Sequence, residues 1–170
     1  MGEATPKSLA TLLAGQDLSR RTGILELPVK SLGLEGDFAV GLNVGHGDIC
    51  RWKVDRVQAG RTRIGLRWDG IVSDLESITA DLSIPGYCIW ISNVDVLLAG
   101  IPHSDRSRFW EFMRIAFRPP RGLLLSMPEK ATHILSSEER ALWLEYGRLS
   151  IWKSDERGER QWRKTMTLEE

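Results

Sequence analysis

The sequence predicts an α/β fold in which helices cover both faces of a mainly parallel sheet, a three-layer α/β/α arrangement. Residues 89–91 begin a nearly continuous apolar run, which is typical of a strand buried on both faces. Similar runs alternate along the chain with amphipathic helical patterns, the order that βαβ units produce. A chain of 170 residues suits one domain. We therefore expect residues 1–170 to form a single domain with flexible ends at residues 1–6 and 155–170.

Composition argues against several classes of protein. Lys+Arg and Asp+Glu both count 23, so the net charge is zero and no overall field attracts nucleic acid or an anionic membrane. No apolar run reaches the ~18 residues of a membrane helix, and the first residues lack the apolar segment of a secretory signal. Two cysteines, Cys50 and Cys88, fit a reducing compartment. We expect a cytoplasmic protein without a membrane partner.

The first third of the chain predicts a strand that leads into a glycine-rich turn. Residues 7–14 predict a short helix, a short strand follows within residues 19–29, and residues 28–37 read as a loop. The apolar stretch FAVGLNV, residues 38–44, predicts the first central strand, and GHGDIC comes directly after it. A glycine-rich turn between a strand and a helix presents bare amides to an anion. Its position therefore indicates a phosphate-binding loop.

The remaining elements continue the alternation of helices and strands. We expect helices over residues 49–59, 74–82, 104–117 and 136–146, and strands over residues 62–68, 87–91, 122–126 and 148–153. Ser104 and Asp105 are suitable caps for the third of these helices, and Pro119 stops it. Ser136 and Glu139 predict a capping box at the start of the fourth.

Residues 86–130 resemble part of the core of P-loop ATPases of the AAA+ type, most visibly replication initiators of the DnaA kind. In that pattern an apolar strand ends in two acids, a helix follows, and the next strand closes on a polar sensor residue. The resemblance makes residues 87–91 the acid-bearing (Walker B) strand and places Ser126 at the end of the sensor strand. It implies a P-loop NTPase-like sheet. In size and layout the chain is also similar to the small companion proteins of BREX-like phage-defence systems.

The residues that this chemistry needs are missing from both halves of the motif. Ser92 and Asn93 stand where the pattern has its acids, and Asp95 follows two residues later. Against G-x-x-x-x-G-K-[ST], Asp48 replaces the lysine that contacts phosphate and Ile49 replaces the hydroxyl residue that holds magnesium. We therefore expect no catalytic residue, no metal and no cofactor, with ATP and Mg²⁺ kept as an alternative. The nucleotide-site remnant comprises Gly45, Gly47, Asp48, Asp95 and Ser126.

Two groups of residues are candidates for partner contact. Arg114, Arg118 and Arg121 share one helical face or its extension, a pattern that suits phosphate groups, although a solvated helix face is the interpretation we favour. Of the seven tryptophans, three are expected in the core and four lie among charges, where they predict a protein-binding surface. The core set is Trp90, Trp110 and Trp143, and the surface set is Trp52, Trp68, Trp152 and Trp162. None of the histidines, His46, His103 and His133, has metal-ligand spacing.

Three functions remain open. The first is a catalytically inactive P-loop-like protein that acts as a protein-binding subunit or regulator of a larger ATPase or DNA-processing complex, in a phage-defence setting. Its partner would be another protein or a second copy of the chain, with nucleic acid reached through the complex. The second is a nucleotide-binding ATPase that uses Asp48 or Asp95 in a non-standard site. The third is a signalling or DNA-binding adaptor that depends on the arginine-bearing helix or on the stretch SRRTGILEL, which resembles the PATAN-type bacterial signalling domain.

Overall fold

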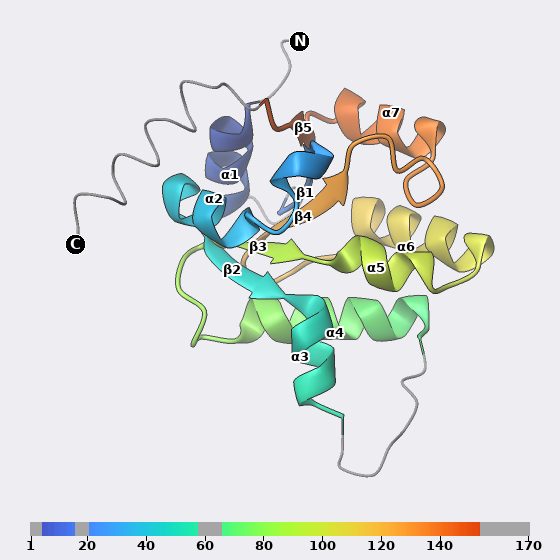
Figure 1. Cartoon of the computed structure of the whole chain (residues 1–170), viewed down its shortest axis with the longest axis horizontal. Coiled ribbons are helices and arrows are strands. Elements are labelled where there is room, and N and C mark those ends of the chain that lie inside the picture. The colour runs from blue at the N-terminus through green and yellow to red at the C-terminus, as the bar shows by residue number, and fades with distance from the viewer. Residues whose placement is uncertain (1–4, 16–20, 58–65, 154–170) are drawn as a thin grey trace.

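The computed structural model describes residues 5–15, 21–57 and 66–153. Five parallel strands form one sheet in the order β2-β3-β4-β1-β5 (Figure 1). The strands are β1 (Thr22–Leu27), β2 (Gly45–Asp48), β3 (Cys88–Ser92), β4 (Gly122–Pro128) and β5 (Leu149–Ile151). The predicted α/β class is therefore confirmed, and the sheet is parallel in every pair.

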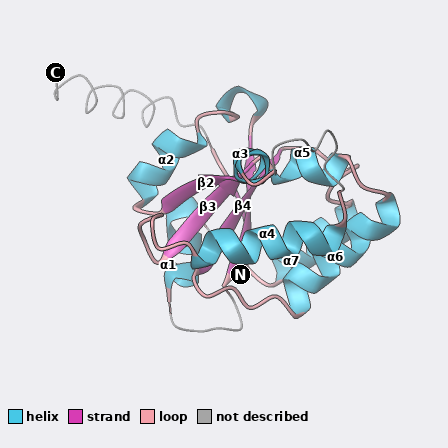
Figure 2. Cartoon of the chain, turned by 90° about the horizontal axis from the view of Figure 1, so that it is seen from below, coloured by secondary structure: helices cyan, strands magenta, loops and turns pink. Residues whose placement is uncertain are grey.

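Helices cover both faces of this sheet. They are α1 (Pro6–Ala14), α2 (Glu35–Leu42), α3 (Ile49–Asp55), α4 (Trp68–Ala80), α5 (Val94–Ala99), α6 (His103–Ile115) and α7 (Ser137–Glu145), and the described residues also include the 3₁₀ turn η2 (Val29–Ser31). α1 and α2 pack on one face, while α4, α5, α6 and α7 share a core with the other, as Figure 2 shows from below. The layers are those that the sequence predicts.

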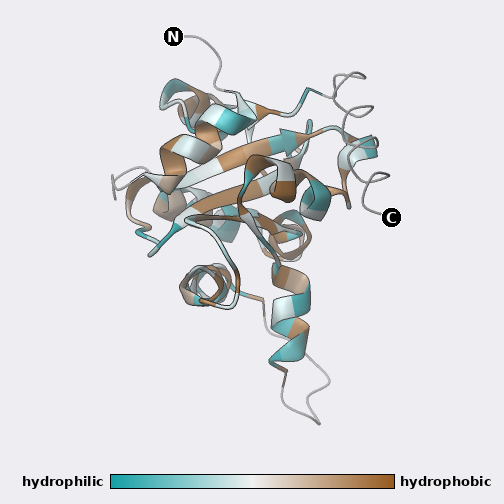
Figure 3. Ribbon diagram, turned by 90° about the vertical axis from the view of Figure 1, so that its left-hand side faces the viewer, coloured by the Kyte–Doolittle hydropathy of each residue, from teal (hydrophilic) through white to brown (hydrophobic). Residues whose placement is uncertain are grey.

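Alternation along the strands divides the core into two clusters. On β3, Ile89 and Ile91 face the larger cluster with α4, α5 and α6, whereas Cys88 and Trp90 face the smaller one with α1 and α2. Side chains on a strand point alternately to opposite faces, so a strand covered on both faces is apolar throughout. The brown strands inside Figure 3 show this pattern.

Side-chain caps begin α1 and α7, and the sequence predicted the second of them. Thr5 and Ser8 form a reciprocal capping box at α1, with Pro6 in the first turn. Ser136 accepts a hydrogen bond from the Glu139 amide at the start of α7. The other predicted cap is wrong: α6 begins after Pro102 without a side-chain cap, and Ser104 and Asp105 lie inside its first turn.

The predicted strand over residues 38–44 is wrong, because this stretch lies mostly in α2. Phe38 and Ala39 are buried on the sheet while Val40 is 77% exposed, which is the one-sided burial of a helix. Acidic side chains occupy the first turn, where the helix dipole favours them, and Asn43 ends the helix in the left-handed conformation (φ 55°). A short apolar run does not distinguish a buried strand from a helix.

Two consequences follow for neighbouring elements. GHGDIC is not a phosphate-binding loop, because its first four residues form the edge strand β2. The strand predicted over residues 62–68 is also not observed: residues 62–65 lie outside the described residues, and Trp68 already begins α4. The short strand predicted within residues 19–29 is the observed β1, and it lies between β4 and β5 in the sheet.

Candidate functional site

The carboxyl ends of β1 and β4 mark the point where the fold would accept a ligand. These strands are neighbours, yet the helix after β1 (α2) packs on one face and the helix after β4 (α7) on the other. In open α/β sheets, ligands bind outside the carboxyl ends of strands whose connections diverge in this way. The polar residues along this edge of the sheet are therefore the candidates for a site.

Gly45 and Gly47 of the predicted nucleotide-site remnant lie in β2, where packing requires their small size. A Cβ on Gly45 would come 2.2 Å from the carbonyl oxygen of Pro85, a backbone atom that has no room to move. A Cβ on Gly47 would come 3.3 Å from methyl groups of Ile78 and Ile91. The glycines allow β2 to approach the chain that precedes β3 and the helix α4.

Asp48 stands at the carboxyl end of β2 and caps α3. Its Oδ1 accepts hydrogen bonds from the amides of Cys50 (2.9 Å) and Arg51 (3.1 Å). Its Oδ2 accepts one from Nδ2 of Asn93 (2.8 Å), which follows β3 with a positive φ of 64°. The carboxylate thus joins the ends of two neighbouring strands, and the two residues that replace parts of the ATPase motif contact each other.

The other two members of the predicted remnant lie at the same edge. Asp95 is half-buried in the first turn of α5, and burial raises the pKa of its carboxyl group. Ser126 is buried in β4, and its hydroxyl donates to the carbonyl of Ile91 (3.3 Å). Both positions are close to where the resemblance puts catalytic groups, but the Ser126 hydroxyl already has a partner inside the sheet.

One polar pair at this edge was not predicted from the sequence. Nε2 of His46 lies 3.1 Å from Oγ of Ser92, on the face of the sheet that α2 covers. Burial lowers the pKa of His46, while the charges of Glu35 and Asp48 act in the opposite direction. His46 and Ser92 stand 46 positions apart, so spacing gave no sign of the contact. Their hydrogen bond ties the edge strand to β3.

The three predicted contact arginines do not share one face, because α6 ends at Ile115. Arg114 forms a half-buried ion pair with Glu139 (2.9 Å). Arg121 donates to four backbone carbonyls at the end of α4 and the loop that follows it. Arg118 is exposed and donates to the adjacent carbonyl of Phe117. All three guanidinium groups thus bond to the chain's own backbone or side chains, and Arg118 is the exposed one of the three.

The tryptophans predicted for the core are buried, and Trp152 borders a groove. Trp90, Trp110 and Trp143 are each at most 2% exposed. Trp152 is half-buried and stacks on Phe38 with ring centroids 4.4 Å apart. It lines an open groove of about 320 Å³ at the start of α1 and the end of β5. The groove is lined by Thr5, Pro6, Lys7, Leu42, Ile151, Trp152 and Lys153.

The remaining predicted surface tryptophans are half-buried or lie outside the described residues. Trp52 packs against the core, with the guanidinium of Arg56 3.2 Å from its ring centroid. Trp68 packs against Phe112 at 5.7 Å between centroids. Trp162 lies beyond the described residues. Of this set, Trp152 is the member that the structure places at a groove.

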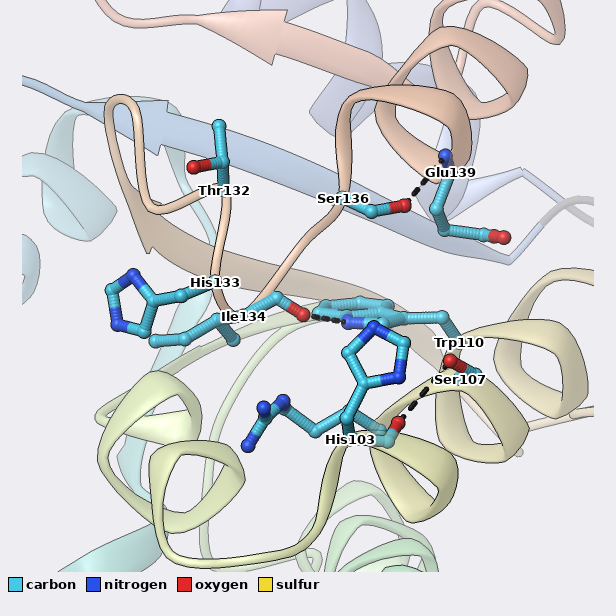
Figure 4. Close-up of a pocket in the computed structure, with 9 residues that line it drawn as sticks. His103, Ser107, Trp110, Thr132, His133, Ile134, Ser136 and Glu139 are labelled. Carbon is cyan, nitrogen blue, oxygen red and sulfur yellow. Dashed lines mark hydrogen bonds between the residues drawn. The ribbon is translucent and has the colours of Figure 1, made fainter.

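A smaller pocket lies between the start of α6 and the loop that joins β4 to α7 (Figure 4). Its volume is about 60 Å³, more than the ~10–15 Å³ that one water requires and well below the ~300 Å³ of a site for a drug-sized ligand. Trp110 forms one wall, and its indole N–H donates to the Ile134 carbonyl (2.8 Å). The other lining residues are His103, Arg106, Ser107, Thr132, His133, Ser136 and Glu139.

Within the described ranges, no group of three or more His, Cys, Asp or Glu side chains could hold a metal ion. None of the helices in that part of the chain combines the length and apolar character that crossing a bilayer requires. Fold and site together define an α/β protein with an open parallel sheet and a polar carboxyl edge. Comparisons with protein-family models, with curated proteins and with solved structures give no match.

Proposed function

We propose that this chain is a P-loop-like protein that does not hydrolyse ATP and that binds a protein partner as a subunit or regulator of a larger assembly. An ATPase or DNA-processing complex of the phage-defence kind, in the cytoplasm, is the setting we favour from the sequence resemblance. The observation that carries the proposal is the groove beside Trp152.

The groove has the chemistry of a peptide-binding site. Leu42, Ile151 and Trp152 supply an apolar floor, and large aromatic side chains are enriched at protein interfaces. Lys7 is exposed and adds positive charge at its border. We therefore infer that the occupant is a partner segment that inserts one apolar side chain beside Trp152 and carries acidic residues next to it.

The carboxyl edge of the sheet supports the other half of the proposal. Three hydrogen bonds from the chain itself already engage the Asp48 carboxylate, at the position that the ATPase motif gives to lysine. A triphosphate placed there would meet a negative group in place of a positive one. The expected consequence is that ATP with Mg²⁺ leaves the melting temperature unchanged. A ligand at one hundred times its Kd would add about 2.7 kcal/mol of stability, which a melting curve resolves.

The groove is tested with an array of acidic peptides that each carry one central leucine, phenylalanine or tryptophan. Lys7→Glu reverses an exposed charge at the groove, and Lys30→Glu makes the same change at an exposed position outside it. We expect binding by the wild type and by Lys30→Glu, and at least about tenfold weaker binding by Lys7→Glu. Equal binding by all three proteins, or none by the wild type, would contradict the assignment.

The two halves of the proposal fail separately. A rise in melting temperature with ATP and Mg²⁺ that disappears in Asp48→Ala or Asp95→Ala would favour the non-standard nucleotide site instead. DNA affinity that falls steeply with salt and is lost in Arg118→Ala would favour the adaptor.

A further inference from the structure

We propose that the pocket between α6 and the β4–α7 loop binds a small tetrahedral oxyanion of the size of inorganic phosphate. This site is separate from the groove of the proposed function and from the predicted nucleotide-site remnant. Residues from two distant parts of the chain form it: His103 and Arg106 come from α6, and His133 comes from the loop. Figure 4 shows the His103 imidazole in front of Trp110 and the His133 imidazole to the left, beyond Ile134.

The charge of the pocket favours an anion. Glu139 lines it, but its Oε1 already accepts hydrogen bonds from Nε of Arg114 (2.9 Å) and Nε1 of Trp143 (3.0 Å). Arg106 also lines it, and no ion pair among the described residues involves its guanidinium. The charge of Glu139 is therefore compensated by Arg114, which does not line the pocket. Arg106 does line it and has no acidic partner in the described part of the chain.

The charge of Arg106 is fixed in place beside the pocket. Its Nη1 donates to the carbonyls of Leu98 and Ile101 and so fixes the side chain at the α5–α6 turn. Its Nε is buried and has no hydrogen-bond partner among the described residues. A charge that is partly buried without a counter-ion is costly, so an anion held in the pocket by the charge of this guanidinium would stabilise it.

Neutral donors surround this charge. The Ser136 hydroxyl oxygen accepts from the Glu139 amide, which leaves its own hydrogen available to a ligand. The two imidazoles and the Thr132 hydroxyl add further N–H and O–H groups at the rim. Several donors around a space of about 60 Å³ suit the oxygens of a phosphate ion, and the arginine disfavours a metal cation.

The three histidines of the chain provide a direct test. The protein is titrated with sodium phosphate at fixed pH and ionic strength, with sodium chloride as the reference, and the imidazole carbon-bound protons are followed by NMR. His103→Ala and His133→Ala assign two of the signals, and both residues are exposed, so the fold should tolerate the changes. We expect the His103 and His133 signals to move with one common Kd, while the His46 signal at the sheet edge stays in place.

Variants then separate this site from general charge attraction. His103→Ala and His133→Ala combined should weaken phosphate binding about tenfold or more. Ser104→Ala and Arg108→Ala are the controls, because both positions are exposed on α6 and neither lines the pocket. The proposal would be overturned if phosphate shifted the His103 and His133 signals no more than chloride does. It would also be overturned if the double variant bound phosphate with the Kd of the wild type. Acetate binding as tightly as phosphate would overturn the tetrahedral class.

Discussion

Replacement of Arg121 should destabilise the protein far more than replacement of its neighbour Arg118. The Arg121 guanidinium donates to the carbonyls of Thr79 (2.7 Å), Asp81 (2.5 Å), Ile84 (2.6 Å) and Gly86 (3.1 Å). It thereby holds the end of α4 and the loop that leads into β3. The side chain acts as a clamp between these segments and the start of β4.

The magnitude follows from the number and kind of these bonds. A hydrogen bond to a charged group contributes about 1.5–3 kcal/mol, but the contributions are not additive, and carbonyls in an exposed loop regain water when the donor is removed. We therefore expect Arg121→Ala to lose about 2–4 kcal/mol of unfolding free energy, a fall in Tm of roughly 5–15 °C. Urea unfolding monitored by tryptophan fluorescence measures the loss.

Arg118→Ala is the matched control, because Arg118 is exposed and bonds only to the carbonyl next to it among the contacts described. Its loss should stay within about 0.5 kcal/mol. If the two variants were equally stable, the clamp would have no energetic role. If Arg121→Ala also kept full stability but lost salt-dependent affinity for DNA, a nucleic-acid contact would replace the structural one.

Three further predictions concern the sheet. Gly45→Ala should cost about 1–3 kcal/mol through its contact with the Pro85 carbonyl, whereas Gly70→Ala, in open space on α4, should be neutral or stabilising; equal melting temperatures would contradict this. Because burial lowers the pKa of His46 below its ordinary 6.5, the unfolded chain binds that proton more tightly. Wild type should therefore lose stability relative to His46→Gln as pH falls below about 6.5, and parallel pH profiles in urea unfolding would refute it. Burial raises the pKa of Cys88 to about 12, so a thiol reagent should label it only in denaturant, and rapid labelling of the native protein would show the thiol to be accessible.

The strongly patterned elements could be predicted from the sequence. Residues 87–91 and 122–126 are close to the observed β3 and β4, because strands buried on both faces leave a continuous apolar run. The helix over residues 136–146 and the strand over residues 148–153 were confirmed for a similar reason, a capped amphipathic helix followed by alternating residues. Their parallel pairing followed from the alternation of helices and strands.

The carboxyl edge was predicted less well. GHGDIC was interpreted through its glycines, but Asp48 directly before a helical pattern is also the signature of an N-cap, which is the role it has. The pair of His46 and Ser92 and the pocket around His103 and His133 join residues that lie tens of positions apart. Such contacts depend on how the loops fold back over the sheet, and local periodicity contains no information about that.

The position of β1 in the sheet has a consequence for the order in which the protein is made. β1 pairs with β4 and β5. Thr22 is therefore synthesised about a hundred residues before its partner Leu123, and Ile24 is synthesised well before its partner Leu149. At roughly 5–20 residues per second, a ribosome needs about 5–20 s to supply the first of these neighbours. During that time the apolar strand β1 has no hydrogen-bonding partner along either edge, which makes the nascent chain a substrate for chaperones or a site of aggregation.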